Sequence, residues 1–164
     1  HWVTSTGAWD KLLKLLEPPI KLAEENNINL VLETGNNAMV PSAWLGRKLI
    51  DDIGSEHLRI LWDPANSLYA NEPTYPDGWE ALKDGYIGHF HIKDAKVNMP
   101  HAHVEFCEMG SGDMAPYLEP LANKMKLNNY DGYISLESVY RPNDGTFEDG
   151  YRASLPKFME LFDW

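Results

Sequence analysis

The sequence has 164 residues, which is enough for one domain with a buried core. A hydrophobic content of 43% and six tryptophans argue against disorder, and no apolar run approaches the roughly 20 residues of a membrane span. The net charge of -11 repels phosphate backbones, so general nucleic-acid binding is disfavoured. We therefore expect a folded domain with neither a membrane nor a nucleic acid as partner.

The one cysteine and the first residue bear on the cellular compartment. Cys107 has no partner for an internal disulfide and no zinc-ribbon spacing, which fits a reducing compartment. The chain begins with His1 and shows no basic and apolar leader. We expect a cytoplasmic protein, and a removed N-terminal signal stays open as the alternative.

Four short apolar runs have the length and the β-branched or aromatic content of strands. They are "INLVLE" (28–33), "LRILWD" (58–63), "YIGHFHI" (86–92) and "GYISLE" (132–137).

Helical patterns fill the intervals before, between and after these runs. The first has a leucine stripe, a capping candidate in Ser5 or Thr6, and the pair Pro18-Pro19, which should end or kink it and start a second short helix. The predicted helices cover 6–27, 41–54, 77–84, 113–127 and 149–162.

Alternating strands and helices predict a parallel sheet with right-handed crossovers. Glu33 and Asp63 at the first two strand ends are 30 residues apart, and Asp63 and His91 are 28 apart. A (β/α)₈ barrel of ~250 residues averages about 31 residues per unit. We therefore expect a single domain over 1–164 that forms the last four units of a TIM barrel, its C-terminal half. A small open α/β sheet is the alternative.

Each predicted strand ends on a group that can bind a metal: Glu33, Asp63, His91 and Glu137. The carboxyl ends of parallel strands meet at one edge of the sheet, where ligands bind. Neighbouring carboxylates repel each other, and a cation relieves that repulsion. The pattern predicts a divalent-metal site, whereas a single acidic strand end would merely mark where the chain reaches solvent.

The third strand has two chemically different faces. Side chains alternate along a strand, so His89, His91 and Lys93 share one face while Phe90 and Ile92 share the other. His91 lies nearer the carboxyl end and is the predicted ligand. His89 lies one layer deeper, as a hydrogen-bonded core histidine or as a group that contacts the metal or the substrate. By the same alternation, Trp62 points away from Asp63 into the packing.

The motifs "LETG", "WDPAN", "HFHIKDAK", "GSGD" and "SLES", in this order and spacing, resemble the second half of the xylose-isomerase-like TIM barrels. These are the sugar phosphate isomerases and epimerases, whose superfamily also includes endonuclease IV. The resemblance runs from about residue 20 to the end. It is specific for the superfamily and not for a substrate.

The resemblance implies a function for the four strand ends. In that family the last four strands supply Glu, Asp, His and Glu to one divalent ion, which here gives Glu33, Asp63, His91 and Glu137. It implies an isomerase or epimerase that moves a proton through a metal-stabilised enediolate. Glu33 and Glu137 then exchange protons on the two faces of the substrate, or else they are ligands only.

The sequence departs from the family pattern at two places. Asn66 stands where several epimerases have a histidine, and Lys96 and Val97 stand where an arginine is expected. The precise assignment as a ketose 3-epimerase therefore does not follow. Asn66 also replaces one of the extra ligands that the three-metal endonuclease needs.

The remaining polar residues each allow two interpretations. Three carboxylates and one imidazole suit Mn²⁺, Mg²⁺, Co²⁺ or Zn²⁺. Lys93 either holds a substrate oxygen and stabilises the enediolate, or forms a salt bridge to Asp94 or to a ligand carboxylate. Asn66 either contacts the substrate or forms a local turn with Pro64.

The segment after the third strand is predicted to be a long loop. His101 and His103 lie on it and are expected to be exposed, with a second metal site as the alternative. The glycines of "GSGD" offer backbone N–H groups that can hold phosphate or hydroxyl. Asp113 is expected to cap the following helix.

The leading hypothesis is thus a metal-dependent sugar or sugar phosphate isomerase or epimerase. The alternatives are a dehydratase of a polyol or keto-sugar, an endonuclease IV-like phosphodiesterase and a non-catalytic half-barrel fragment. The expected partners are a small sugar or polyol and a completing half barrel. Four strands leave two unpaired edges, so an N-terminal half or a second copy must close them, and a homo-oligomer is one way of doing so.

Overall fold

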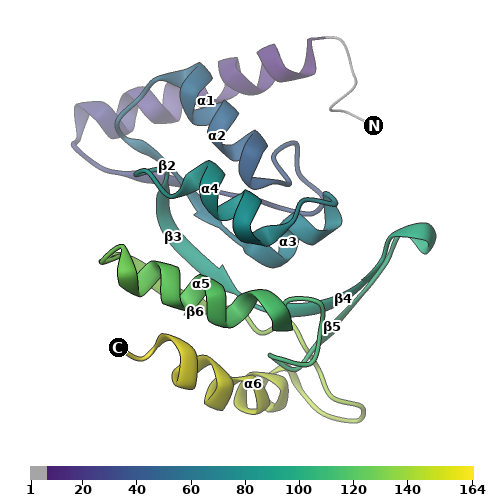
Figure 1. The fold of residues 1–164 in the computed structure, drawn as a ribbon. Coiled ribbons are helices and arrows are strands. Elements are labelled where there is room, and N and C mark those ends of the chain that lie inside the picture. The colour runs from purple at the N-terminus through teal and green to yellow at the C-terminus, as the bar shows by residue number, and fades with distance from the viewer. Residues whose placement is uncertain (1–6) are drawn as a thin grey trace.

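The computed structural model describes residues 7–164, and its centre is a four-stranded parallel sheet (Figure 1). The strands lie in the order β1-β2-β3-β6, so β1 and β6 are the two edges. This architecture confirms the predicted partial barrel. The strands are β1 (Leu30–Glu33), β2 (Leu58–Trp62), β3 (Ile87–Ile92) and β6 (Tyr133–Leu136).

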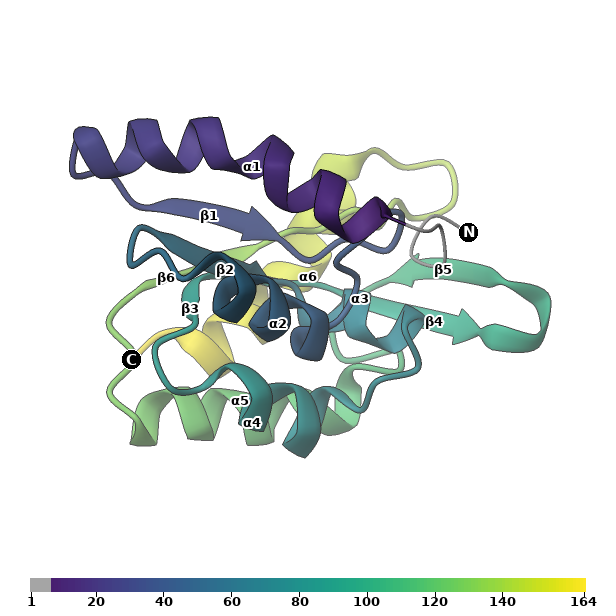
Figure 2. The same cartoon turned by 90° about the horizontal axis from the view of Figure 1, so that it is seen from above.

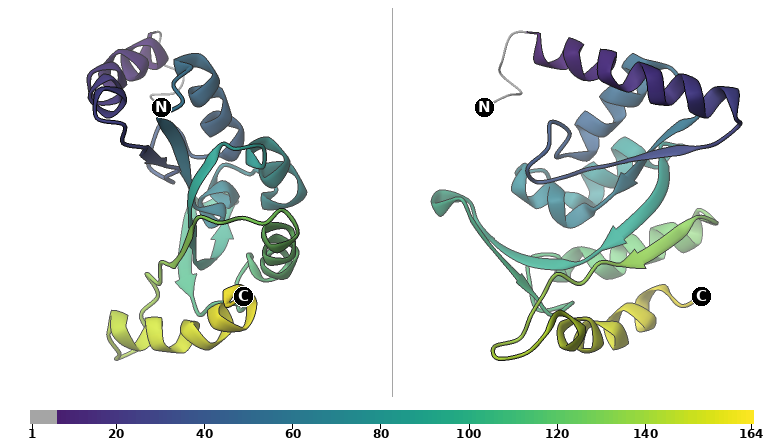
Figure 3. Two further views of the ribbon diagram at one scale, coloured as in Figure 1. Left: turned by 90° about the vertical axis from the view of Figure 1, so that its left-hand side faces the viewer. Right: turned by 180° about the vertical axis from the view of Figure 1, so that it is seen from behind.

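Helices follow the curve of the sheet from α1 at one end to α6 at the other, and no helix of residues 7–164 covers the opposite side of the sheet (Figure 3). None of the helices within residues 7–164 is long and apolar enough to cross a membrane. The predicted helices are confirmed, but the short α3 directly after Asp63 was not expected. The helices are α1 (Ala8–Glu25), α2 (Ala43–Ile53), α3 (Pro64–Tyr69), α4 (Trp79–Leu82), α5 (Ala115–Leu127) and α6 (Phe147–Phe162), with the short turns η1 (Thr74–Gly78) and η2 (Met99–His101).

Helix α1 runs through Pro18 and Pro19 as one element, so the expected end and restart at these prolines are wrong. An internal proline removes the hydrogen bond to the carbonyl four residues earlier. For Pro19 that carbonyl belongs to Leu15, whose side chain is exposed, so water can take the place of the lost donor. The expected caps Ser5 and Thr6 lie outside the described residues, and α1 follows Gly7 without a side-chain cap.

The core lies between the sheet and its helices. Phe90 and Ile92 are buried there, and the ring of Trp62 packs 5.5 Å from that of Phe90. His89 and His91 contact each other on the opposite face of β3. The predicted alternation of the third strand is therefore confirmed, and so is the packing role of Trp62.

The segment after β3 is a β-hairpin and not an irregular loop. Strands β4 (Asp94–Asn98) and β5 (His103–Cys107) pair antiparallel and project beyond the sheet (Figure 2). The oppositely charged Lys96 and Glu105 face each other in this pairing, which favours it. His101 and His103 at the end of the hairpin are exposed, as expected.

The base of the hairpin is held by one buried carboxylate. Asp94 accepts hydrogen bonds of 2.8–3.0 Å from four backbone N–H groups, those of Ala95, Gly110, Gly112 and Met114. Within "GSGD", the N–H groups of Gly110 and Gly112 therefore bind this carboxylate, and those of Ser111 and Asp113 donate to the carbonyls of Glu108 and Ala95. Contrary to the expectation, these N–H groups are not free to hold an external phosphate or hydroxyl.

The expected cap of helix α5 is also wrong. Asp113 accepts from the Val97 N–H at 2.7 Å and so fastens the hairpin, while α5 begins after Met114 without a side-chain cap.

Asp94→Ala is expected to lower the free energy of unfolding by about 3 kcal/mol, because it leaves buried N–H groups without an acceptor. Urea denaturation measures this loss. Asp113→Ala is the matched control, since it removes one exposed acceptor and should cost about 1 kcal/mol. Equal effects of the two substitutions would contradict the clamp role of Asp94.

Candidate metal centre

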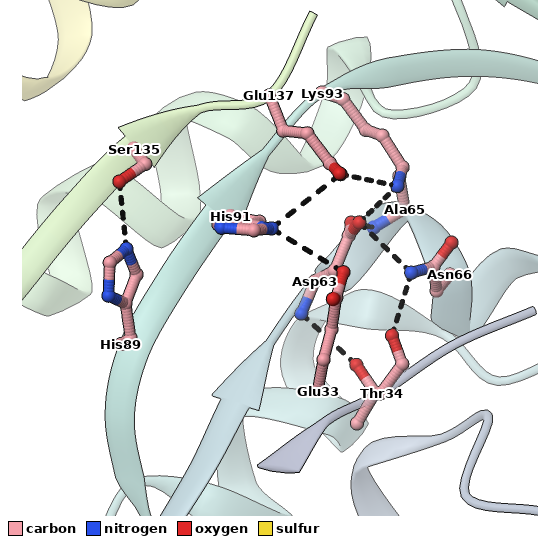
Figure 4. A network of polar contacts seen from close by, with 10 residues as sticks. All are labelled: Glu33, Thr34, Asp63, Ala65, Asn66, His89, His91, Lys93, Ser135 and Glu137. Carbon is pink, nitrogen blue, oxygen red and sulfur yellow. Dashed lines mark hydrogen bonds and ion pairs between the residues drawn. The ribbon is translucent and has the colours of Figure 1, made fainter. Parts of the chain in front are cut away.

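The four residues predicted as metal ligands lie together at the carboxyl ends of the four parallel strands (Figure 4). Each offers one ligand atom, and these atoms all lie within 4.8 Å of one another. Glu33 ends edge strand β1, while Glu137 directly follows the other edge strand, β6. The curvature of the sheet brings the two edge carboxylates to the same place.

His91 stands between the two glutamates. Its Nδ1 atom lies 3.4 Å from Oε1 of Glu33 and 3.6 Å from Oε2 of Glu137. This nitrogen is buried and has no hydrogen-bonding partner within residues 7–164. A buried nitrogen without a partner is costly, and a cation among the carboxylates would use its lone pair.

Asp63 is fully buried and held by its neighbours. Its backbone N–H donates to Thr34 Oγ1 at 3.1 Å, and its Oδ1 accepts from the Ala65 N–H at the start of α3. Burial raises the pKa of Asp63 to about 7, and the ammonium of Lys93 opposes this rise. The sequence placed Asp63 at a strand end but did not indicate these supports.

Lys93 forms ion pairs with the carboxylates of Asp63 and Glu137, the latter at 2.7 Å. Of the predicted salt-bridge partners, the ligand carboxylates are therefore the ones present and Asp94 is not. Burial favours a lower pKa of Lys93, but the two carboxylates outweigh it and raise the pKa. Burial likewise favours a higher pKa of Glu137, but the hydrogen bond from Lys93 outweighs it and lowers the pKa.

Asn66 and His89, the two other predicted substrate contacts, form hydrogen bonds with neighbouring groups of the protein. The side-chain amide of Asn66 donates to the Thr34 carbonyl at 2.7 Å and to Asp63 Oδ2 at 3.0 Å, so it orients Asp63. His89 Nε2 lies 2.8 Å from Ser135 Oγ, and burial lowers the pKa of His89. Substrate contacts of Asn66 and His89 stay predictions.

Thr34 and Ser135 were missed by the sequence reasoning. Both stand inside the motifs "LETG" and "SLES", next to or near a ligand, and that adjacency was the available signal. The Thr34 hydroxyl accepts from the backbone N–H of Asp63, and the Ser135 hydroxyl lies in hydrogen-bonding distance of the His89 ring.

The donor set fits a divalent cation. Three carboxylate oxygens and one imidazole suit Mg²⁺, Mn²⁺, Co²⁺ or Zn²⁺. The partnerless Nδ1 of His91 faces two of the carboxylates, as a ligand nitrogen should. Glu33, Asp63, His91 and Glu137 are therefore the residues that would hold the ion.

The fold is a partial α/β barrel, and its candidate metal ligands lie at the carboxyl ends of the parallel strands. The xylose isomerase-like TIM barrel family matches residues 2–160, and the chain belongs to this family. No curated protein matches the chain.

Several solved structures share the fold. The 3-keto-D-glucoside 4-epimerase YcjR from E. coli is 22% identical, has a TM-score of 0.68, and the match covers 94% of this chain and 54% of that one. AsbF from Bacillus anthracis, a probable 3-DHS dehydratase, is 15% identical and has a TM-score of 0.74, and the match covers 95% of this chain and 58% of that one. The IOLI protein with a zinc atom is 16% identical and has a TM-score of 0.65, and the match covers 94% of this chain and 54% of that one. The chain thus spans little more than half the length of these proteins.

Proposed function

We propose that the protein containing this chain is a divalent-metal-dependent isomerase or epimerase of a sugar or sugar phosphate. The observation that carries the proposal is that Glu33 and Glu137, from the two edges of the sheet, both approach His91 Nδ1, at 3.4 and 3.6 Å. An epimerisation that removes a proton from one face of a carbon and returns one on the other face needs two such groups. The fold similarity to epimerases such as YcjR and an L-ribulose 3-epimerase agrees with this chemistry.

The residues have distinct roles in this proposal. The bound cation supplies a positive charge that polarises the substrate carbonyl. Glu137 removes or returns the proton beside the carbonyl on one face, and Glu33 does so on the other. Lys93, held between Asp63 and Glu137, donates a hydrogen bond to the substrate oxygen on which negative charge develops.

The two alternative activities, a dehydratase and a phosphodiesterase, differ in how much supports them. A dehydratase begins with the same proton removal, and the similarity to AsbF keeps it as the second candidate. The phosphodiesterase has less support, because residues 7–164 contain one cluster of potential metal ligands and the net charge is -11. Because the chain spans about half of its structural relatives, the activity is proposed for a barrel completed by an N-terminal half or by a second copy.

Deuterium exchange tests the proposed function. The protein, loaded with Mg²⁺ or Mn²⁺, is incubated in D₂O with a panel of ketoses and ketose phosphates. We expect deuterium to enter a carbon next to the carbonyl of at least one of them, and NMR and mass spectrometry detect it. A product that has lost one water molecule relative to the substrate would identify a dehydratase instead. No exchange with any sugar, while calorimetry shows the metal bound, would exclude the proposal.

A further inference from the structure

A hollow of about 410 Å³ lies between the β4–β5 hairpin and the segments that follow β1 and β2. This volume is within the range of small-molecule sites. The hollow lies over the carboxyl ends of the strands, at the same edge of the sheet as the metal centre. The hairpin that forms its outer wall projects from the sheet in Figure 2.

The two walls of the hollow differ in chemistry. The hairpin contributes a mostly apolar wall that includes Phe106, Val97 and Val104. The opposite wall is polar, and its side chains come from Asn36, Asn37 and Tyr69. No lysine or arginine lines the hollow, so it has no permanent cation to bind a phosphate group. The walls complement a neutral ring with one apolar face and several hydroxyls.

The Tyr69 hydroxyl lies beside the side chain of Asn36. It is buried, and burial raises the pKa of Tyr69, against Lys93 and the hydrogen-bonding side chain of Asn36. A ligand hydroxyl that bonds to Asn36 is therefore also close to the hydroxyl of Tyr69.

Lys93 connects the hollow with the metal centre. Its Nζ lies 5.7 Å from the centroid of the Phe106 ring, on the wall of the hollow. The same ammonium contacts the carboxylates of Asp63 and Glu137. Lys93 therefore adjoins both the metal centre and the wall of the hollow.

We propose that this hollow binds a second sugar ring of the substrate, so that the substrate is a glycosylated keto-sugar and not a free monosaccharide. The apolar face of that ring packs on Phe106, and its hydroxyls bond to Asn36 and Tyr69. This inference rests on the proposed function, because it assigns the rest of the molecule whose carbonyl lies at the metal centre.

Calorimetric titration of two probes, with Mg²⁺ present, tests the inference. Fructose offers the ketose alone, and maltulose offers the same ketose carrying a glucosyl ring. We expect maltulose to bind about tenfold more tightly than fructose, and Phe106→Ala to abolish that difference without weakening fructose binding. Equal affinities in the wild-type protein, or binding of neither sugar, would overturn the proposal.

Two more variants separate a local from a general effect. Tyr69→Phe keeps the ring and is expected to reduce the preference for maltulose by several-fold, through the loss of one hydrogen bond. His101→Ala, at the exposed end of the hairpin and outside the hollow, should leave the preference unchanged. A preference that survives both Phe106→Ala and Tyr69→Phe would place the second ring elsewhere.

The sugar-binding test and the deuterium-exchange test can fail separately. If maltulose is preferred and the preference needs Phe106, but no sugar exchanges deuterium, the hollow is a sugar site and the proposed reaction is wrong. If sugars exchange deuterium but fructose and maltulose bind equally, the reaction stands and the second-ring site is wrong.

Discussion

Glu137→Gln is expected to lower turnover by about 10²-fold or more, the scale of losing acid–base catalysis. Glutamine keeps the shape of the side chain but removes the negative charge that contacts Lys93 at 2.7 Å and lies 3.6 Å from His91 Nδ1. It also removes the carboxylate that is proposed to exchange a proton with the substrate. Steady-state kinetics at matched metal occupancy measures the effect.

The control and the metal content make this result interpretable. Glu108→Gln, at an exposed glutamate outside the centre, should leave turnover unchanged. If Glu137→Gln binds the metal normally but turns over slowly, Glu137 acts as the acid–base group. Normal turnover with restored metal would rule out Glu137 as both ligand and base.

His91→Ala is expected to weaken divalent-metal binding by at least tenfold, because the substitution removes the only nitrogen ligand of the cluster. His101→Ala and His103→Ala, on the exposed end of the hairpin, are matched controls and should have little effect. Calorimetric titration with Mn²⁺ and Zn²⁺ compares the three variants. If the hairpin variants lose the metal and His91→Ala keeps it, the centre at the strand ends is wrong.

The same titration should depend on pH in a defined direction. Burial raises the pKa of Asp63 to about 7, so below pH 7 this carboxyl holds a proton that an incoming cation must displace. Affinity should therefore fall as the pH drops from 8 to 6, and binding at pH 6 should release a proton. Added metal should raise the melting temperature in step with affinity, since it binds the folded chain. Equal affinities at the two pH values would contradict a ligand carboxyl that titrates near pH 7.

The sequence by itself determined how the third strand is oriented. Alternation along residues 89–92 separates two histidines from Phe90 and Ile92, and the structure buries the latter pair in the core. This inference needs no knowledge of neighbours, because the pleat of a strand fixes which side chains share a face. The convergence of the strand-end residues was predictable for a similar reason, since parallel strands bring their carboxyl ends to one edge.

Only the tertiary structure decided the partners of the charged groups. Lys93 and Asp94 are adjacent in sequence, yet Lys93 pairs with Asp63 and Glu137 while Asp94 binds backbone amides of the segment before α5. Lys93 lies between β3 and β4, and Asp94 is the first residue of β4. Which distant group each one meets depends on where β2, β6 and the hairpin lie, and no local pattern contains that information. The same reason explains why the hollow beside Phe106 was not foreseen, because its walls come from three separate segments.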